Sequence, residues 1–177
     1  MKEEECPFIT IYDWMHTLNL SGRELLVYAL VHGFNRPENE CFGYGYKQRI
    51  AERLRMHPSG VSRALSVLKR MGLIKESFWE DGGSTLEADF DGSGPFISVY
   101  DWMLSLDLPG RELLVFALVY GFNRDGKECY GRREWISRRL NISNPSKVIA
   151  SLKAKGLIWE KRNPDKSSVL IASPVKN

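Results

Sequence analysis

The chain has 177 residues, of which 43% are hydrophobic and 27% charged, and its formal net charge is +3. This is the composition of an ordinary folded protein, and the length fits two small domains that each have a hydrophobic core. No apolar run approaches the roughly 20 residues that cross a bilayer, and residues 1–6 lack the apolar core of a signal peptide. We therefore expect a cytoplasmic protein with no membrane span.

A long segment of the sequence occurs twice. Residues 7–15 return as residues 95–103, and residues 22–31 return as residues 110–119, both at an offset of 88 positions. Similarity at a fixed offset indicates that one structural unit has been duplicated. We predict a first domain at residues 7–88 (repeat 1), a linker at 89–94 and a second domain at 95–174 (repeat 2).

Each repeat should begin with a strand and a helix. Residues 8–12 alternate and are rich in aromatic and β-branched side chains, which favours a short strand, and a helical turn is expected at 14–18. Ser21 and Glu24 have the spacing of a capping box, so a helix should begin there and continue to Phe34. In repeat 2, Pro109 replaces Ser21, which suits the first turn of a helix.

This first helix is apolar nearly all round. Val27, Tyr28 and Val31 lie off its main apolar stripe, and Val115, Phe116 and Val119 repeat them. The extra apolar face could pack the two repeats together or join two chains as a homodimer. Nearby, Trp14 and Trp102 are expected to be packing residues, and Asp13 and Asp101 to be local caps.

The second half of each repeat predicts two helices and a hairpin. In repeat 1 we expect helices at 46–54 and from about 59 to 71, stopped by Gly72, and a hairpin that turns at 81–84 and returns over 85–88. In repeat 2 the corresponding segments are 133–140, a helix ending at Lys155, 157–162 and 168–172. The predicted fold class is mainly α with small β-hairpins, in two tandem winged helix-turn-helix domains, each with a three-helix core and a wing.

The motifs of repeat 1 resemble known families. Residues 49–54, 60–65 and 68–74 look like the winged-helix modules of bacterial transcriptional regulators. The wider pattern of residues 22–30, Cys41-Phe42 and 50–54 is similar to the amino-terminal domains of plasmid replication initiators and phage replisome organisers. Those families usually carry one such domain beside other modules, whereas this chain is almost entirely the domain twice over. The resemblance implies a protein that binds double-stranded DNA.

Charge is segregated along the sequence in a way that agrees with a DNA partner. Basic residues dominate 47–75 and 132–166, while the stretch 76–91 is acidic. Clustering of this kind in a folded domain suggests a polyanion partner, although a solvated charged face is the alternative. Glu80 and Asp81 make the repeat 1 wing unsuited to a minor groove.

The third helix of repeat 1 is the expected reading helix. A helical wheel places Val61, Ala64, Leu65, Leu68 and Met71 on one side, with Val67 flanking the opposite face. Arginine on that opposite face can hold guanine O6 and N7 in a bidentate fork, and a thymine methyl can meet Val67. The predicted DNA-binding residues of repeat 1 are Ser59, Ser62, Arg63, Ser66 and Arg70.

Repeat 2 predicts a different surface. Its third helix offers Lys147, Ala150 and Ala154 in place of the Arg, Ser and Arg face of repeat 1. From Leu54 to Ser62 there are eight steps, against six from Leu140 to Ser146, so we expect a shorter turn and a helix that starts differently. Phosphate attachment is expected to outweigh base reading here. The predicted DNA-binding residues of repeat 2 are Arg133, Ser143, Asn144, Ser146, Lys147, Ser151, Lys161, Arg162 and Lys166.

Catalysis finds little support in the sequence. His16 and His32 align with Leu104 and Tyr120, which indicates packing, and His57 falls in the break before the third helix. Cys6, Cys41 and Cys129 have no Cys or His partner at zinc spacing, and Cys41 and Cys129 are expected to be half-buried loop residues. We expect neither a cofactor nor an enzyme. The function predicted is double-stranded DNA binding, in transcription regulation or in replication initiation at a plasmid origin; the alternative is a protein-interaction module of such a complex.

Overall fold

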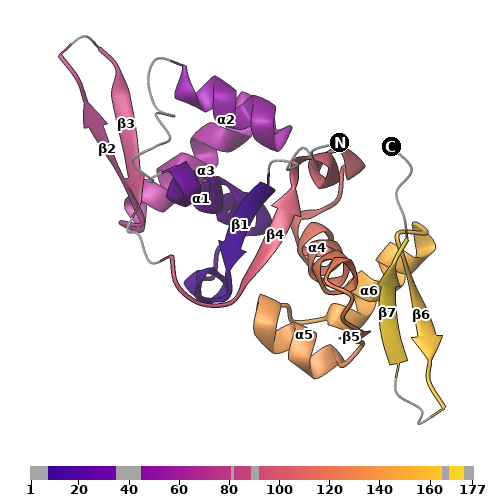
Figure 1. The fold of residues 1–177 in the computed structure, drawn as a ribbon. Coiled ribbons are helices and arrows are strands. Elements are labelled where there is room, and N and C mark those ends of the chain that lie inside the picture. The colour runs from indigo at the N-terminus through magenta and orange to yellow at the C-terminus, as the bar shows by residue number, and fades with distance from the viewer. Residues whose placement is uncertain (1–7, 35–44, 81, 89–91, 165–167, 174–177) are drawn as a thin grey trace, which may run out of the picture.

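The computed structural model describes residues 8–34, 45–80, 82–88, 92–164 and 168–173 (Figure 1). Of the described residues, 53% are helical and 22% lie in strands, so the fold is mixed α/β with small antiparallel sheets. The sequence predicted a mainly α fold with small β-hairpins, and the structure has more strand than that class implies. Within the described residues, no helix combines the length and the apolar character needed to cross a bilayer.

Both repeats follow the same order of elements except for β5, whose equivalent in repeat 1 would lie outside the described residues. Repeat 1 contains β1 (Phe8–Tyr12), the 3-10 helix η1 (Asp13–Leu18), α1 (Gly22–Phe34), α2 (Tyr46–Leu54), α3 (Pro58–Arg70), β2 (Ile74–Phe78) and β3 (Ser84–Ala88). Repeat 2 contains β4 (Phe96–Tyr100), η2 (Asp101–Leu106), α4 (Gly110–Arg124), β5 (Cys129–Tyr130), α5 (Arg133–Leu140), α6 (Pro145–Ala154), β6 (Ile158–Arg162) and β7 (Ser168–Ala172).

Helix starts follow from local chemistry. The predicted capping box of α1 is confirmed, because the Ser21 backbone N–H donates to Glu24 Oε2 at 2.7 Å and the Glu24 N–H donates to Ser21 Oγ at 3.4 Å. Pro109, expected inside the first turn of α4, is instead the residue immediately before it. Gly72 and Gly156 follow α3 and α6 with positive φ, as helix-stopping glycines do.

The two repeats are joined by a shared sheet. β1 pairs with β4 in antiparallel register, with Phe8 opposite Tyr100 and Tyr12 opposite Phe96. Thr10 and Ser98 are opposite each other at the centre and are also equivalent positions of the duplication, because they are 88 residues apart. A pseudo-two-fold axis therefore passes between them, and the chain has the symmetry of a C2 dimer within one polypeptide.

The same axis passes between the starts of α1 and α4. A Cβ added at Gly22 would lie 2.7 Å from Gly110 Cα, and one added at Gly110 would lie 2.6 Å from Gly22 Cα. Only two residues without side chains allow the backbones to approach this closely. The glycine that follows position 21 or 109 in each repeat is therefore required by contact between the repeats.

Two ion pairs repeat the symmetry. Arg139 on α5 binds Asp13 on η1, with Nε 3.1 Å from Oδ2, and Arg53 on α2 lies 3.7 Å from Asp101 on η2. Both aspartates were predicted to be local caps, and this was wrong: each neutralises an arginine of the other repeat. Sequence proximity suggested a cap because the arginine partners lie far away along the chain.

The extra apolar face of the first helices is buried inside the chain. Val27, Val31 and Val115 are completely buried, and Tyr28 is 2% exposed. α1 lies against β1 and α4 against β4, so the shared sheet covers these helices. Tyr28 meets the edge of Trp14 at 6.2 Å between ring centroids. Of the two alternatives for this face, packing within one chain is the one observed.

Candidate nucleic-acid interface

The third helix of repeat 1 has the two faces predicted for it. Val61, Ala64, Leu65 and Leu68 are buried, and Val67 is intermediate. Met71 was expected on the buried side but is 48% exposed. α3 ends at Arg70, so the helical periodicity no longer applies to Met71. The helix is thus anchored along one side only.

The opposite side of α3 carries the predicted contact residues. Ser59, Arg63, Ser66 and Arg70 are exposed, while Ser62 is intermediate. Ser66 Oγ donates to the Ser62 carbonyl oxygen at 2.9 Å, which leaves its lone pairs facing outward. In the structure as described, the side chains of Arg63 and Arg70 form no ion pair with a carboxylate. Both guanidinium groups are available to an anion.

His57 begins α3 rather than facing a ligand. It is the residue immediately before the helix, and its Nδ1 accepts a hydrogen bond from the Ser59 N–H at 3.3 Å and lies 2.8 Å from Ser59 Oγ. The side chain of Ser59 is therefore partly engaged by the cap, which makes it a weaker candidate for a base contact than Arg63.

The hairpin of repeat 1 is fixed to its helices through Glu76. Lys69, Tyr46 and Ser84 all donate hydrogen bonds to the Glu76 carboxylate. Burial by itself would raise the pKa of Glu76, but these donors hold it below its usual value, and burial together with the carboxylate raises the pKa of Tyr46. The carboxylate consequently couples α2, α3 and the hairpin.

The third helix of repeat 2 differs from α3 in length and start. α6 has 10 residues, against 13 for α3. From Leu140 to Pro145 there are five steps, against four from Leu54 to Pro58, so the turn of repeat 2 is one residue longer. The prediction of a shorter turn was wrong. Repeat 2 has fewer residues here because α6 is shorter than α3.

Most of the predicted residues at the start of α6 are exposed. Asn144 caps the helix, accepting a hydrogen bond at Oδ1 from the Lys147 N–H at 3.2 Å. Ser143, Ser146 and Lys147 are exposed around it. Asn144 therefore has a structural role that the spacing of the sequence did not reveal.

Two predicted contacts of repeat 2 have partners inside the protein. Arg133 Nη2 lies 3.3 Å from Glu160 Oε1, and Arg133 Nη1 donates to the Gly131 carbonyl. Ser151 Oγ donates to Glu112 Oε1 at 2.9 Å, so this side chain faces α4. Both side chains are partly buried and have partners within the chain.

The basic excess of repeat 2 is partly neutralised in the same way. Glu160 also binds Lys153 at 2.9 Å, and Lys155 binds Glu112 at 2.6 Å. The Lys153 hydrogen bond, with Ser168, lowers the pKa of Glu160 to about 2. Lys161 and Arg162 remain exposed on β6, and Lys166 lies outside the described residues. Among the described contact residues predicted for repeat 2, the cations without a carboxylate partner are Lys147, Lys161 and Arg162.

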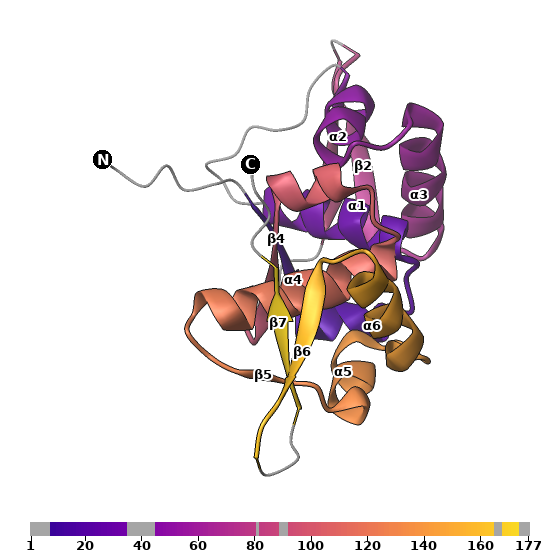
Figure 2. The ribbon, with the colours of Figure 1, turned by 90° about the vertical axis from the view of Figure 1, so that its right-hand side faces the viewer.

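The two third helices lie on the same side of the molecule. Figure 2 shows α3 and α6 one above the other along one edge, with the hairpins β2–β3 and β6–β7 directed to opposite ends. This arrangement follows from the pseudo-two-fold axis, which relates α3 to α6.

Exposed aromatic side chains on the hairpins were not foreseen. Phe78 is 76% exposed, Trp79 is 47% exposed at the end of β2, and Trp159 on β6 is 48% exposed. The sequence signal was present, since a strand with one buried face should not carry a large apolar residue on the other.

The buried histidines and cysteine have packing roles. His16 and His32 are 5% and 2% exposed, and burial lowers the pKa of His16. Cys129, expected to be half-buried in a loop, is 1% exposed on β5, and burial raises its pKa to about 11. Cys6 and Cys41 lie outside the described residues. Within the part of the chain that the structure describes, no cluster of His, Cys, Asp and Glu could hold a metal ion.

Comparison with known proteins gives no further guide, because no protein-family model, curated protein or solved structure matches the chain.

Proposed function

We propose that each repeat is a winged helix-turn-helix unit and that the chain binds double-stranded DNA as a built-in dimer, in transcription regulation or at a replication origin. The observation that carries the proposal is the placement of α3 and α6 on one face of a two-fold arrangement, each with its polar side outward. Two-fold helix-turn-helix proteins present their second helices to successive major grooves in this way.

The units differ in what they offer to a duplex. Arg63 and Arg70 of α3 are exposed and two turns apart, which suits contact with base edges or flanking phosphates. Lys147, Lys161 and Arg162 are the exposed cations among the described contact residues predicted for repeat 2, whereas Arg133, Lys153 and Lys155 are engaged by carboxylates. Repeat 1 therefore supplies sequence discrimination, and repeat 2 supplies a smaller electrostatic share than its composition suggested.

The test begins with a duplex selected from a random pool for retention by the full chain. Arg63→Ala should reduce the preference for this duplex over random sequence by about 10-fold, the effect of losing one bidentate base contact. Combined Lys161→Ala and Arg162→Ala should weaken all duplexes alike and reduce the salt slope by about 2. Fluorescence anisotropy at several salt concentrations measures both quantities.

Lys127→Ala is the charge-matched control. Lys127 is exposed and follows the carboxyl end of α4, whereas the amino end of α4 is the one close to α3. This variant should bind both duplexes as the parent does. Binding that ignores salt, or equal losses from Arg63→Ala and Lys127→Ala, would contradict the proposal.

A second candidate function is protein association through the repeat 1 hairpin. The exposure of Phe78 and Trp79 favours it, because large apolar side chains on a hairpin tip are typical of contact surfaces. Phe78→Ser separates the candidates. If the hairpin enters a groove of DNA, this variant should bind the selected duplex less tightly; if it serves a protein partner, duplex affinity should stay unchanged.

A further inference from the structure

The pseudo-two-fold axis creates two equivalent clefts of different volume, called here the open cleft and the closed cleft. Each cleft lies between the helix–helix turn of one repeat and the 3-10 helix and first helix of the other. The cleft that contains the repeat 1 turn has a volume of about 460 Å³, and the cleft that contains the repeat 2 turn has about 140 Å³. A difference of this size between equivalent places needs a specific cause.

A bridge of two asparagines spans the smaller cleft. Asn141 Nδ2 donates to Asn19 Oδ1 at 2.8 Å and to the His16 carbonyl at 3.1 Å, which ties the repeat 2 turn across its cleft. At the equivalent places of the open cleft stand Arg55 and Asp107, and no hydrogen bond joins these two described side chains. The open cleft therefore lacks the asparagine pair that bridges the closed cleft.

The residue that replaces Asn141 is unfavourable for its backbone. Arg55 has a φ of 51° and Asn141 a φ of 50°, both in the left-handed region. Asparagine tolerates this conformation well, whereas a long side chain there costs about 1 kcal/mol. A strained arginine beside an open cavity is the pattern expected of a functional site.

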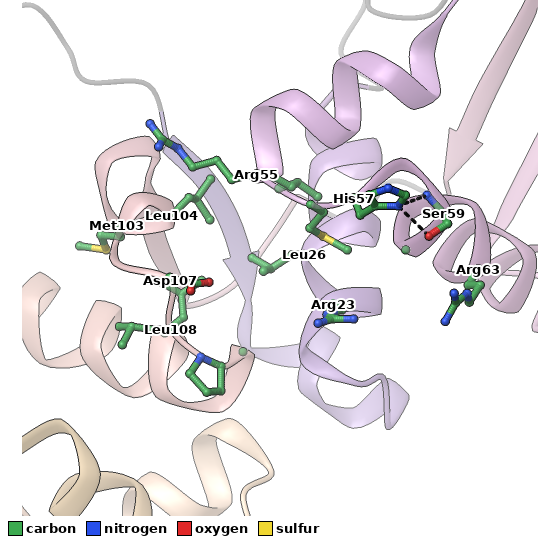
Figure 3. Close-up of a pocket in the computed structure, with 16 residues that line it drawn as sticks. Arg23, Leu26, Arg55, His57, Ser59, Arg63, Met103, Leu104, Asp107 and Leu108 are labelled. Carbon is green, nitrogen blue, oxygen red and sulfur yellow. Dashed lines mark hydrogen bonds between the residues drawn. The ribbon is translucent and has the colours of Figure 1, made fainter. Parts of the chain in front are cut away.

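The lining of the open cleft combines an apolar floor with a cationic side. Figure 3 shows Leu26, Leu104 and Leu108 along the cavity, with the guanidinium groups of Arg23 and Arg63 on the α1 and α3 side. Asp107 is the carboxylate opposite them. Among the described residues, Arg23 and Arg63 have no ion-pair partner. With Arg55, three arginines and one carboxylate line the cavity, so its net charge is positive.

We propose that the open cleft binds a small organic oxyanion with an apolar body. Its volume lies within the roughly 300–1,000 Å³ of typical ligand pockets. The oxyanion is held by Arg23 and Arg63, and the apolar body lies on Leu26, Leu104 and Leu108. A phosphate of DNA could satisfy the same arginines, but it would leave the leucines uncovered. Because the ligand occupies Arg63, which is also a proposed DNA contact, bound ligand opposes duplex binding. This consequence alone rests on the proposed DNA function.

Fluorescence titration of the full chain with 8-anilinonaphthalene-1-sulfonate, in the absence of DNA, tests the site. We expect saturable binding, weakened about 10-fold by Arg23→Gln, because a hydrogen bond to a charged group is lost. Arg111→Gln is the matched control, since Arg111 is the equivalent of Arg23 and lines the closed cleft. It should bind the probe as the parent does.

A second variant closes the cleft instead of removing charge at its arginine pair. The combined variant Arg55→Asn and Asp107→Asn recreates the asparagine bridge, and asparagine suits the left-handed backbone at position 55. This variant should not bind the probe. Circular dichroism should show that it remains folded. Displacement adds a further readout: 1-naphthoate should compete far better than inorganic phosphate. Equal effects of Arg23→Gln and Arg111→Gln, unchanged binding to the closed variant, or equal competition by the two anions would overturn the proposal.

Discussion

At Gly22 and Gly110 the backbones of the two repeats are in contact, so we predict that a single methyl group there is destabilising. Gly22→Ala would place its Cβ 2.7 Å from Gly110 Cα, and backbone atoms cannot move aside as a flexible side chain can. We expect the free energy of unfolding to fall by about 1–3 kcal/mol, the usual effect of overpacking. Urea denaturation followed by circular dichroism measures it.

Gly33→Ala is the control in the same helix. A Cβ added at Gly33 meets nothing within 4 Å, so alanine should raise stability by about 0.5–1 kcal/mol through its better helix propensity. Equal effects at the two positions would show that contact between the repeats does not constrain Gly22.

The low pKa of Glu160 predicts that the stability of the fold depends on pH. Its folded pKa of about 2 lies below the unfolded value of about 4.3, because Lys153 and Ser168 donate to the carboxylate. A depressed carboxyl pKa stabilises the fold above the unfolded pKa, and this contribution disappears as the pH falls from about 4.3 to about 2. The difference in unfolding free energy between the parent and Glu160→Gln should therefore narrow over this range.

In a Lys153→Gln background, replacing Glu160 by Gln should change the free energy of unfolding less than it does in the parent. The reason is that Lys153 is the largest cause of the low pKa of Glu160. Guanidinium denaturation at pH 6, 4 and 2.5 provides the values. A difference between parent and Glu160→Gln that stays constant from pH 6 to 2.5 would mean that the Glu160 pairs do not stabilise the fold.

The orientation of a single side chain could be predicted where it depends only on neighbouring residues in the sequence. The outward positions Arg63, Ser66 and Arg70 follow from helical periodicity alone, and the structure places them as predicted. The internal partners of Arg133 and Ser151 could not be foreseen, because Glu160 and Glu112 are 27 and 39 residues away. A sequence without an alignment gives no signal for such distant pairs.

At the scale of the element, Asn144 is predicted to stabilise α6 by capping. Its Oδ1 accepts the Lys147 N–H, so Asn144→Ala should lower the free energy of unfolding by about 1 kcal/mol. Asn144→Asp retains a capping oxygen and should keep most of the stability. Ser143→Ala is the control, since Ser143 is exposed just before the cap. Thermal unfolding of the four chains distinguishes a cap from a surface residue; equal stability of Asn144→Ala and Ser143→Ala would exclude the capping role.

Except for the two-residue strand β5, the described elements could be predicted to within about two residues, and their partners could not. The periodicity of residues 22–34 and 46–54 and the turn glycines determine each helix by local propensity. Nothing in the alternation of residues 8–12 says which strand they pair with, since a five-residue strand suits its own repeat or another. The shared sheet therefore emerged only from the structure.

At the scale of the whole molecule, the symmetry explains how the chain became asymmetric. In a dimer of identical subunits, a substitution that opens one cleft opens both, and one that changes one reading helix changes both. The duplication removes this restriction: Arg55 and Asp107 could open one cleft while Asn141 and Asn19 keep the other closed. The same freedom allowed α3 and α6 to diverge.

The symmetry also makes a prediction about the separated halves. The β1–β4 register is symmetric about Thr10 and Ser98, so a fragment of residues 95–177 can satisfy β4 by pairing it with β4 of a second copy around Ser98. The same arrangement would bring two copies of Gly110 together and bury the apolar face of α4. Light scattering after size-exclusion chromatography should therefore give a fragment mass of two copies. Gly110→Ala in the fragment should shift it toward monomer, because the added Cβ meets the backbone of the other copy, whereas Gly121→Ala, with nothing within 4 Å, should leave the dimer intact. A folded monomeric fragment would show that the covalent link, rather than the symmetric contact, holds the repeats together.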